Sequence, residues 1–115
     1  MNFKKNIKTY CFDIDGVICF TKGNDYVNSR PNIKGIKKIN ELHSKGNIII
    51  VFTARFMGRS AEDANLAKKK AYNLTHNQLK KWGVNYAKLI FGKPSFDYII
   101  DDKSIFFNKY WHKFI

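Results

Sequence analysis

A chain of 115 residues, 44% of them hydrophobic and 16% aromatic, is long enough for one domain with its own core, spanning residues 1–115, and too apolar to be disordered. No apolar run approaches the ~20 residues of a membrane helix, and no signal peptide is expected because Asp13 and Asp15 interrupt the first apolar stretch. We therefore expect a cytoplasmic protein without membrane contact, with Cys11 and Cys19 present as thiols.

The net charge of +12 suggests an anionic partner. Of the 21 basic residues, 18 are Lys and only 3 are Arg, the residue that makes bidentate contacts with phosphates and guanine. Enrichment in Lys together with abundant Asn is also what an AT-rich coding sequence produces. We interpret the charge as a solvated basic surface that attracts anionic substrates, and nucleic acid is disfavoured as a partner.

The N-terminal part of the chain predicts a strand followed by a flap. Residues 9–14 are rich in β-formers and indicate a buried strand that ends at an acidic pair. Gly16 then allows a sharp turn. Residues 22–25 are polar and typical of a turn, so we predict a short hairpin or flap over residues 17–27.

The middle of the chain predicts two helices around a strand. From Asn32 the apolar residues recur every three positions, which indicates a helix that ends at Gly46. Residues 48–52 form a continuous apolar run, as expected for a central parallel strand covered on both faces. A long helix is predicted from about Ser60, a good N-cap residue, to Trp82.

The remaining residues predict two short strands, at 88–91 and 97–100, and a final helix in the aromatic tail 105–115. We expect this tail to pack on the sheet rather than against another copy of the chain. The alternation of strands and helices predicts a three-layer α/β fold with a mainly parallel sheet. In such a fold the ligand crevice lies at the carboxyl ends of the strands.

Polar residues follow each predicted strand at this edge of the sheet. They are Asp13, Asp15, Thr53, Arg55, Lys93, Asp101 and Asp102. Four neighbouring carboxylates repel each other by more than ~1 kcal/mol per pair even at an effective dielectric constant of about 20. Such a cluster requires a cation, and oxygen ligands without His or Cys favour Mg²⁺.

Four segments, in chain order, resemble the motifs of the haloacid dehalogenase superfamily. Residues 13–17 (Asp-Ile-Asp-Gly-Val) resemble the DxDG(T/V) signature of its phosphatases, and residues 52–53, 93–94 and 100–102 are similar to its second, third and fourth motifs. The resemblance covers residues 9–103 and implies a three-layer, Rossmann-like phosphatase core.

Within that superfamily, residues 53–55 and 91–103 resemble very small phosphatases found with capsule and surface-polysaccharide biosynthesis genes. One departure is Val17, which stands where many members have Thr. This change removes a hydroxyl group without removing a ligand.

The resemblance implies a role for each motif residue. Asp13 would attack the phosphorus to form an aspartyl-phosphate, and Asp15 would protonate the leaving alkoxide and then deprotonate water. Thr53 and Lys93 would bind the phosphoryl oxygens. Mg²⁺ would be held by Asp13, the backbone carbonyl of Asp15, Asp101 and, through a water, Asp102.

Members of the superfamily usually insert a cap domain between the motifs, but here the spacing leaves no room for one. Residues 16–53 accommodate a flap and a helix, and residues 53–93 accommodate one long helix and a strand. A capless site suits a large substrate or a roof supplied by a neighbouring subunit in a homo-oligomer. Arg55 is the first candidate for binding the leaving group. The loops and the flap also offer Arg59, Lys22, Asn24, Tyr26 and Arg30, for which a solvated loop residue is the favoured interpretation.

The expected function is Mg²⁺-dependent hydrolysis of a small phosphorylated metabolite, a sugar phosphate or amino-alcohol phosphate, in surface-polysaccharide biosynthesis. One alternative is a nucleic-acid end phosphatase, which the charge and the open site favour. A response-regulator receiver is disfavoured because its acidic pair closes the first strand, whereas here the paired acids come last. A non-catalytic interaction module is disfavoured because every chemical position is present.

Overall fold

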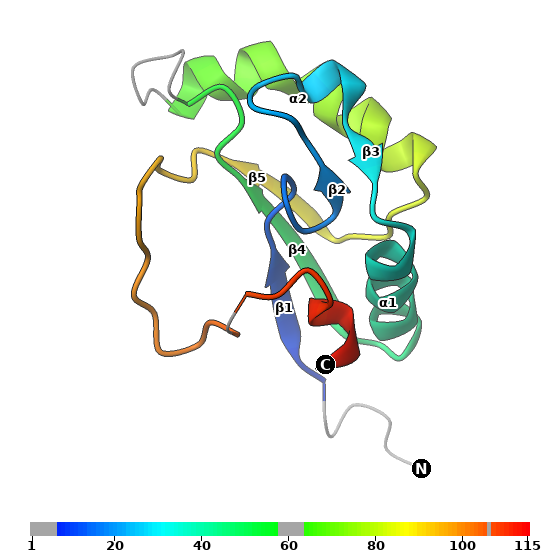
Figure 1. Ribbon diagram of the computed structural model, residues 1–115. Coiled ribbons are helices and arrows are strands. Elements are labelled where there is room, and N and C mark those ends of the chain that lie inside the picture. Colours follow the sequence, from blue (N-terminus) through cyan, green and yellow to red (C-terminus); the bar gives the residue numbers. More distant parts are fainter. Residues whose placement is uncertain (1–6, 58–63, 106) are drawn as a thin grey trace.

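The computed structural model describes residues 7–57, 64–105 and 107–115. Within these residues the chain forms a small α/β fold around a three-stranded parallel sheet in the order β1-β4-β5 (Figure 1). The elements of this unit are β1 (Thr9–Phe12), α1 (Ile33–Ser44), β4 (Ile48–Thr53), α2 (Ala64–Lys81) and β5 (Lys88–Phe91). The parallel sheet is therefore confirmed, and the start predicted for the second helix near Ser60 lies outside the described residues.

Both helices cover the same face of the sheet. Each later strand of the chain lies on the same side of the strand before it, and right-handed β-α-β crossovers then place both helices on one face. Ile49 and Val51 of β4 are completely buried there, in one core cluster with Ile39 of α1 and Leu79 of α2. Opposite that face, Ile48 remains 45% exposed. The expected covering of both faces is thus wrong for the described residues: β4 alternates between inward and outward residues despite its uniformly apolar sequence.

The predicted flap is confirmed and extends further than expected. β2 (Cys19–Phe20) pairs in antiparallel fashion with β3 (Arg30–Pro31), and the short 3-10 helix η1 (Tyr26–Asn28) lies between them. Gly16 has φ +89°, a left-handed conformation that only glycine adopts without strain, and it turns the chain from β1 into the flap. The flap lies over the carboxyl ends of β1 and β4 (Figure 1). No cap domain is present between the motifs in the described residues.

The start of α1 packs against the C-terminal 3-10 helix η3 (Trp111–Lys113). Asn32 caps α1 by accepting the Gly35 backbone N–H at 3.1 Å. The carbonyl of Val17 accepts from both the Asn32 side chain (3.1 Å) and the Trp111 indole (3.2 Å). A Cβ atom at Gly35 would lie only 2.8 Å from both side chains, so glycine is what allows this approach. The tail therefore packs on the domain, through a short 3-10 helix rather than a full helix.

The segment between β5 and η3 differs most from the sequence expectation. No strand forms over residues 97–100, where Tyr98 is 87% and Ile100 94% exposed, and the segment loops out beside the sheet (Figure 1). A strand exists only through hydrogen bonds with a neighbour, so an apolar run alone does not produce one.

Among the described residues, no helix is long and apolar enough to cross a membrane.

Candidate functional site

Asp13 and Lys93 face each other at the carboxyl edge of the sheet, Asp13 directly after β1 and Lys93 shortly after β5. Lys93 Nζ lies 3.5 Å from Asp13 Oδ2, and Asp13 Oδ1 accepts the Ile14 backbone N–H at 2.8 Å. Burial raises the pKa of Asp13 above its ordinary value of 3.8, while the positive charge of Lys93 opposes that shift. The arrangement holds a partly desolvated carboxylate next to a cation.

Thr53, the last residue of β4, lies between these two strand ends and is completely buried. Its carbonyl accepts the Lys93 backbone N–H at 3.1 Å, and its hydroxyl oxygen accepts the Arg55 backbone N–H at 3.1 Å. Thr53 therefore fixes the backbone positions of both basic residues that follow the strands. The sequence prediction that Asp13, Thr53 and Lys93 share one edge agrees with this geometry.

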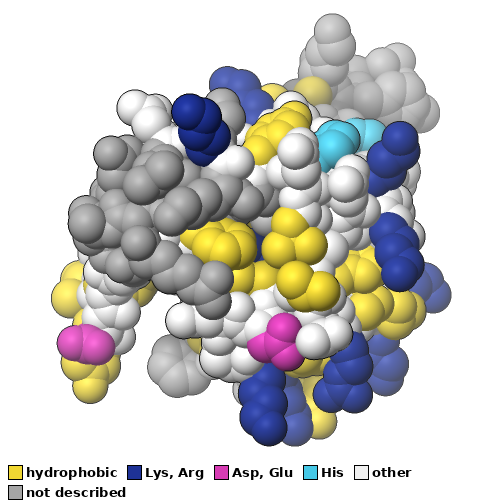
Figure 2. Space-filling model, turned by 90° about the horizontal axis from the view of Figure 1, so that it is seen from above, with side chains coloured by type: hydrophobic (Ala, Val, Ile, Leu, Met, Phe, Trp, Pro, Cys, Tyr) yellow, Lys and Arg dark blue, Asp and Glu magenta, His cyan; other side chains and the backbone are white. Residues whose placement is uncertain are grey.

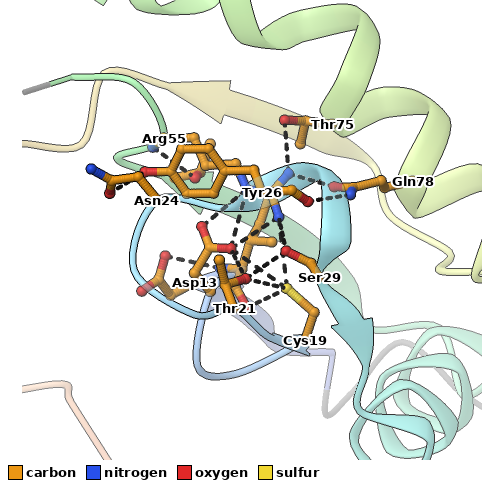
Figure 3. Close-up of polar contacts among 12 residues, drawn as sticks. Asp13, Cys19, Thr21, Asn24, Tyr26, Ser29, Arg55, Thr75 and Gln78 are labelled. Atoms are coloured by element: carbon orange, nitrogen blue, oxygen red, sulfur yellow. Dashed lines mark hydrogen bonds and ion pairs between the residues drawn. The ribbon is translucent and has the colours of Figure 1, made fainter. Parts of the chain in front are cut away.

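Asp15 is held by donors from the flap and from Arg55. Its Oδ1 accepts from the Thr21 hydroxyl at 2.5 Å and from Arg55 Nη2 at 2.9 Å, and its Oδ2 accepts from Arg55 Nε at 3.0 Å. The Thr21 hydroxyl also lies 2.6 Å from the Ser29 hydroxyl across the flap (Figure 3). This bidentate, charge-assisted pairing restricts the orientation of the Asp15 carboxylate.

Arg55 is only 1% exposed, and its guanidinium lies at the centre of a polar network (Figure 3). Besides the pair with Asp15, Nη1 donates to Thr75 (3.2 Å) and Gln78 (2.5 Å) of α2. The guanidinium carbon lies 4.9 Å from the ring centre of Tyr26. The interpretation of Arg55 as a residue that contacts the leaving group does not agree with this burial, because its donors already face protein acceptors.

Asp101 and Asp102 are exposed in the segment after β5. Asp101 Oδ1 accepts the Lys103 backbone N–H at 2.8 Å, a local turn contact. The described part of the chain contains no group of three or more His, Cys, Asp or Glu that could hold a metal ion. The expected convergence of four acids is therefore absent from this arrangement, because it depended on a strand at 97–100 that does not form.

An open pocket of about 460 Å³ lies at the flap and is lined by three of the candidate leaving-group contacts, Lys22, Asn24 and Tyr26, but not by Arg30. Arg59 lies outside the described residues. Its lining consists of Lys22, Asn24, Asp25, Tyr26, Val27, Phe56 and Leu74. The rings of Tyr26 and Phe56 are 4.9 Å apart. Phe56 has φ +65°, a strained backbone conformation for a bulky residue and one that is enriched at functional sites. The size and aromatic lining suit a small organic group.

Cys19 is buried beside Asp15, with its sulfur 3.6 Å from Oδ1. Burial raises the pKa of the Cys19 thiol, so this group stays protonated and is not a nucleophile at neutral pH. Cys11 and Cys19 are both free, as expected.

Sequence reasoning missed the four residues that complete the network around Arg55 and Asp15. They are Thr21, Ser29, Thr75 and Gln78. The sequence does contain one signal: Thr75 and Gln78 are three residues apart in a helix and share a face, next to the core residue Leu79. Polar residues at such inward positions indicate a buried polar partner.

Among the described residues visible from above, basic side chains do not form one continuous patch. Seen from this side, Lys and Arg lie in several groups around the rim, and hydrophobic side chains lie between them (Figure 2). In the visible described residues, the distribution resembles a solvated basic surface more than a phosphate-tracking groove.

The fold has a relative among solved protein structures. No family model and no curated protein matches the chain. A crystal structure of a Vibrio cholerae protein is similar to this chain with a TM-score of 0.80 and 26% sequence identity, over 86% of this chain and 83% of that one. The arrangement of elements described above is thus shared with an experimentally solved protein.

Proposed function

We propose that the protein is a Mg²⁺-dependent phosphomonoesterase with a haloacid dehalogenase core, acting through an aspartyl-phosphate on Asp13. The observation that carries the proposal is the facing pair of Asp13 and Lys93, 3.5 Å apart at the carboxyl edge of the sheet, with Thr53 between their strands. A carboxylate nucleophile must approach an anionic phosphate, and an adjacent cation reduces that repulsion.

In the first step Asp13 Oδ2 attacks the phosphorus, and the bond from phosphorus to the ester oxygen breaks. Lys93, whose amine faces Asp13, stabilises the charge on the transferring phosphoryl oxygens, where most catalysis of phosphoryl transfer is exerted. Thr53 is completely buried as placed, and its role is to hold the Lys93 backbone beside Asp13. The raised pKa of Asp13 makes its carboxylate more basic than an ordinary Asp, which strengthens it as a nucleophile once ionised.

Asp15 supplies the proton transfers. It gives a proton to the departing alkoxide and then takes one from the water that hydrolyses the aspartyl-phosphate, which releases phosphate and restores Asp13. Its side chain is 26% exposed, so a substrate oxygen can reach it. Its hydrogen bonds to Arg55 and Thr21 hold it in one orientation.

The magnesium requirement comes from the sequence motifs, and the residues as placed do not form a complete metal site. Asp13 offers carboxylate oxygens at the edge, but Asp101 and Asp102 are exposed in the segment after β5. Mg²⁺ would supply charge neutralisation when bound.

The substrate proposed is a small phosphorylated metabolite, a sugar phosphate or amino-alcohol phosphate used in surface-polysaccharide biosynthesis. The flap pocket supports a leaving group of this size, because the Tyr26 and Phe56 rings offer an apolar platform and Lys22 and Asn24 line the same space.

The test is phosphate release from acetyl phosphate and para-nitrophenyl phosphate with Mg²⁺ and with a chelator, followed by sugar phosphates, amino-alcohol phosphates and phosphorylated oligonucleotides. We expect Mg²⁺-dependent turnover that is fastest on a small metabolite. Faster release from oligonucleotide ends would replace the substrate class with nucleic acid. A lack of turnover on every compound would support a non-catalytic module instead.

A further inference from the structure

We propose that Arg55 is a positioning residue for Asp15: it fixes one carboxylate oxygen inside the flap and directs the other toward the leaving group. The inference rests on the proposed phosphatase function and assigns Arg55 a role other than substrate binding.

The two oxygens of Asp15 have different surroundings. Oδ1 accepts from the Thr21 hydroxyl, from Arg55 Nη2 and, at 3.3 Å, from Arg55 Nε. Within the described residues, Oδ2 accepts from Arg55 Nε at 3.0 Å and from no other donor. A carboxylate oxygen has two acceptor positions, so Oδ2 retains one for a proton in transit. Arg55 therefore selects the oxygen that acts as acid and base.

Arg55 also connects Asp15 to the flap and to α2. Nη2 donates to the Ser29 hydroxyl at 3.4 Å on the flap, and Nη1 donates to Gln78 on α2. Gln78 in turn donates to the Tyr26 carbonyl at 2.6 Å (Figure 3). Tyr26 also lines the flap pocket. The orientation of Asp15 is thus coupled to the residues that would contact the leaving group.

Stability alone is a poor reason for this arrangement. A buried ion pair is often no more stabilising than well-packed hydrophobic residues, because desolvation of both charges is costly. Here the guanidinium is buried while the Asp15 side chain remains 26% exposed. Placing a buried Arg against a carboxylate that still reaches solvent is the geometry expected of a group that orients another.

The test compares Arg55→Met and Arg55→Lys with wild type on two substrates that differ in leaving-group basicity, an alkyl phosphate and acetyl phosphate. An alkoxide needs a proton from the acid, whereas acetate leaves without one. We expect Arg55→Met to lower the single-turnover rate of aspartyl-phosphate formation at least tenfold more for the alkyl phosphate than for acetyl phosphate, with KM less affected. Arg55→Lys should recover part of that difference. Arg30→Met, an exposed Arg on the same flap, is the matched control and should leave the ratio of the two rates unchanged.

Thermal unfolding of each variant separates folding from positioning. If Arg55→Met does not fold, the ratio of the two rates is measured in Arg55→Lys. Lys keeps the positive charge but lacks the planar guanidinium group that donates two parallel hydrogen bonds. Equal losses in the rate of aspartyl-phosphate formation from both substrates, or no loss from either, would overturn the positioning role while leaving the phosphatase function standing. An inactive wild type on both substrates would instead overturn the proposed function, and this inference with it.

Discussion

Two parts of the proposed site are built in different ways. Asp15 lies in a turn after β1 and is bound by a buried arginine and a flap hydroxyl, whereas Asp101 is exposed and makes a local contact with Lys103. The difference separates two tasks. The residues that would bind and transfer a phosphoryl group are already assembled, whereas those that would complete the metal site are not.

The largest loss of activity is expected from Asp13→Asn, among the residues that would transfer the phosphoryl group. The amide keeps the size of the side chain but removes the anionic nucleophile, so turnover should fall by more than about a thousandfold. Steady-state phosphate release and trapping of the aspartyl-phosphate check this. Substantial residual activity in protein shown by mass spectrometry to be free of deamidation would remove Asp13 from the nucleophile role.

Asp15→Asn should lower turnover by ~10²–10⁴-fold, the usual effect of losing a general acid and base. It should also destabilise the fold more than Asp13→Asn does, because it leaves the Arg55 guanidinium buried without its carboxylate. Urea unfolding of the two variants measures the difference. Equal stability of both variants would contradict the importance of the Asp15–Arg55 pair.

A smaller loss of activity is expected from Asp101→Asn, one of the residues that would complete the metal site. Loss of this carboxylate should raise the Mg²⁺ concentration needed for half-maximal activity by about tenfold or more, on the scale of losing a metal-site contact. Stability without Mg²⁺ should not change, since Asp101 is exposed. Asp97→Asn, an exposed Asp of the same segment, is the control. An unaltered Mg²⁺ dependence in Asp101→Asn would place the metal elsewhere.

The smallest effect concerns pH and the metal-free protein. The pKa of Asp13 is raised in the folded state by burial, so the folded protein binds more protons than the unfolded chain between the ordinary value of 3.8 and the raised value. This contribution to stability is present at low pH and is lost as pH rises through that window. Asp13→Asn should abolish it and be slightly more stable than wild type near neutrality, as measured by urea unfolding with a chelator across pH.

The predictability of this molecule follows the same division. The sequence predicts the positions of Asp13, Thr53 and Lys93, because each residue ends or follows a strand with a clear β pattern and parallel strands end at one edge. It does not predict the burial of Arg55, whose acceptors come from the β1 turn, the flap and α2. The sequence also predicts a strand over residues 97–100 that does not form. Its apolar pattern favours a strand, but a strand needs a hydrogen-bonding neighbour, which the sequence does not show.

The close approach at Gly35 has a consequence for how related sequences vary. Because a Cβ at position 35 would lie 2.8 Å from both the Asn32 amide and the Trp111 ring, position 35 cannot gain volume while those two side chains stay in place. Homologues with Ala or a larger residue at 35 should therefore carry a smaller residue at 111, a different helix cap at 32, or both. An alignment in which these three columns vary independently would show that the tail can detach from α1 at little cost.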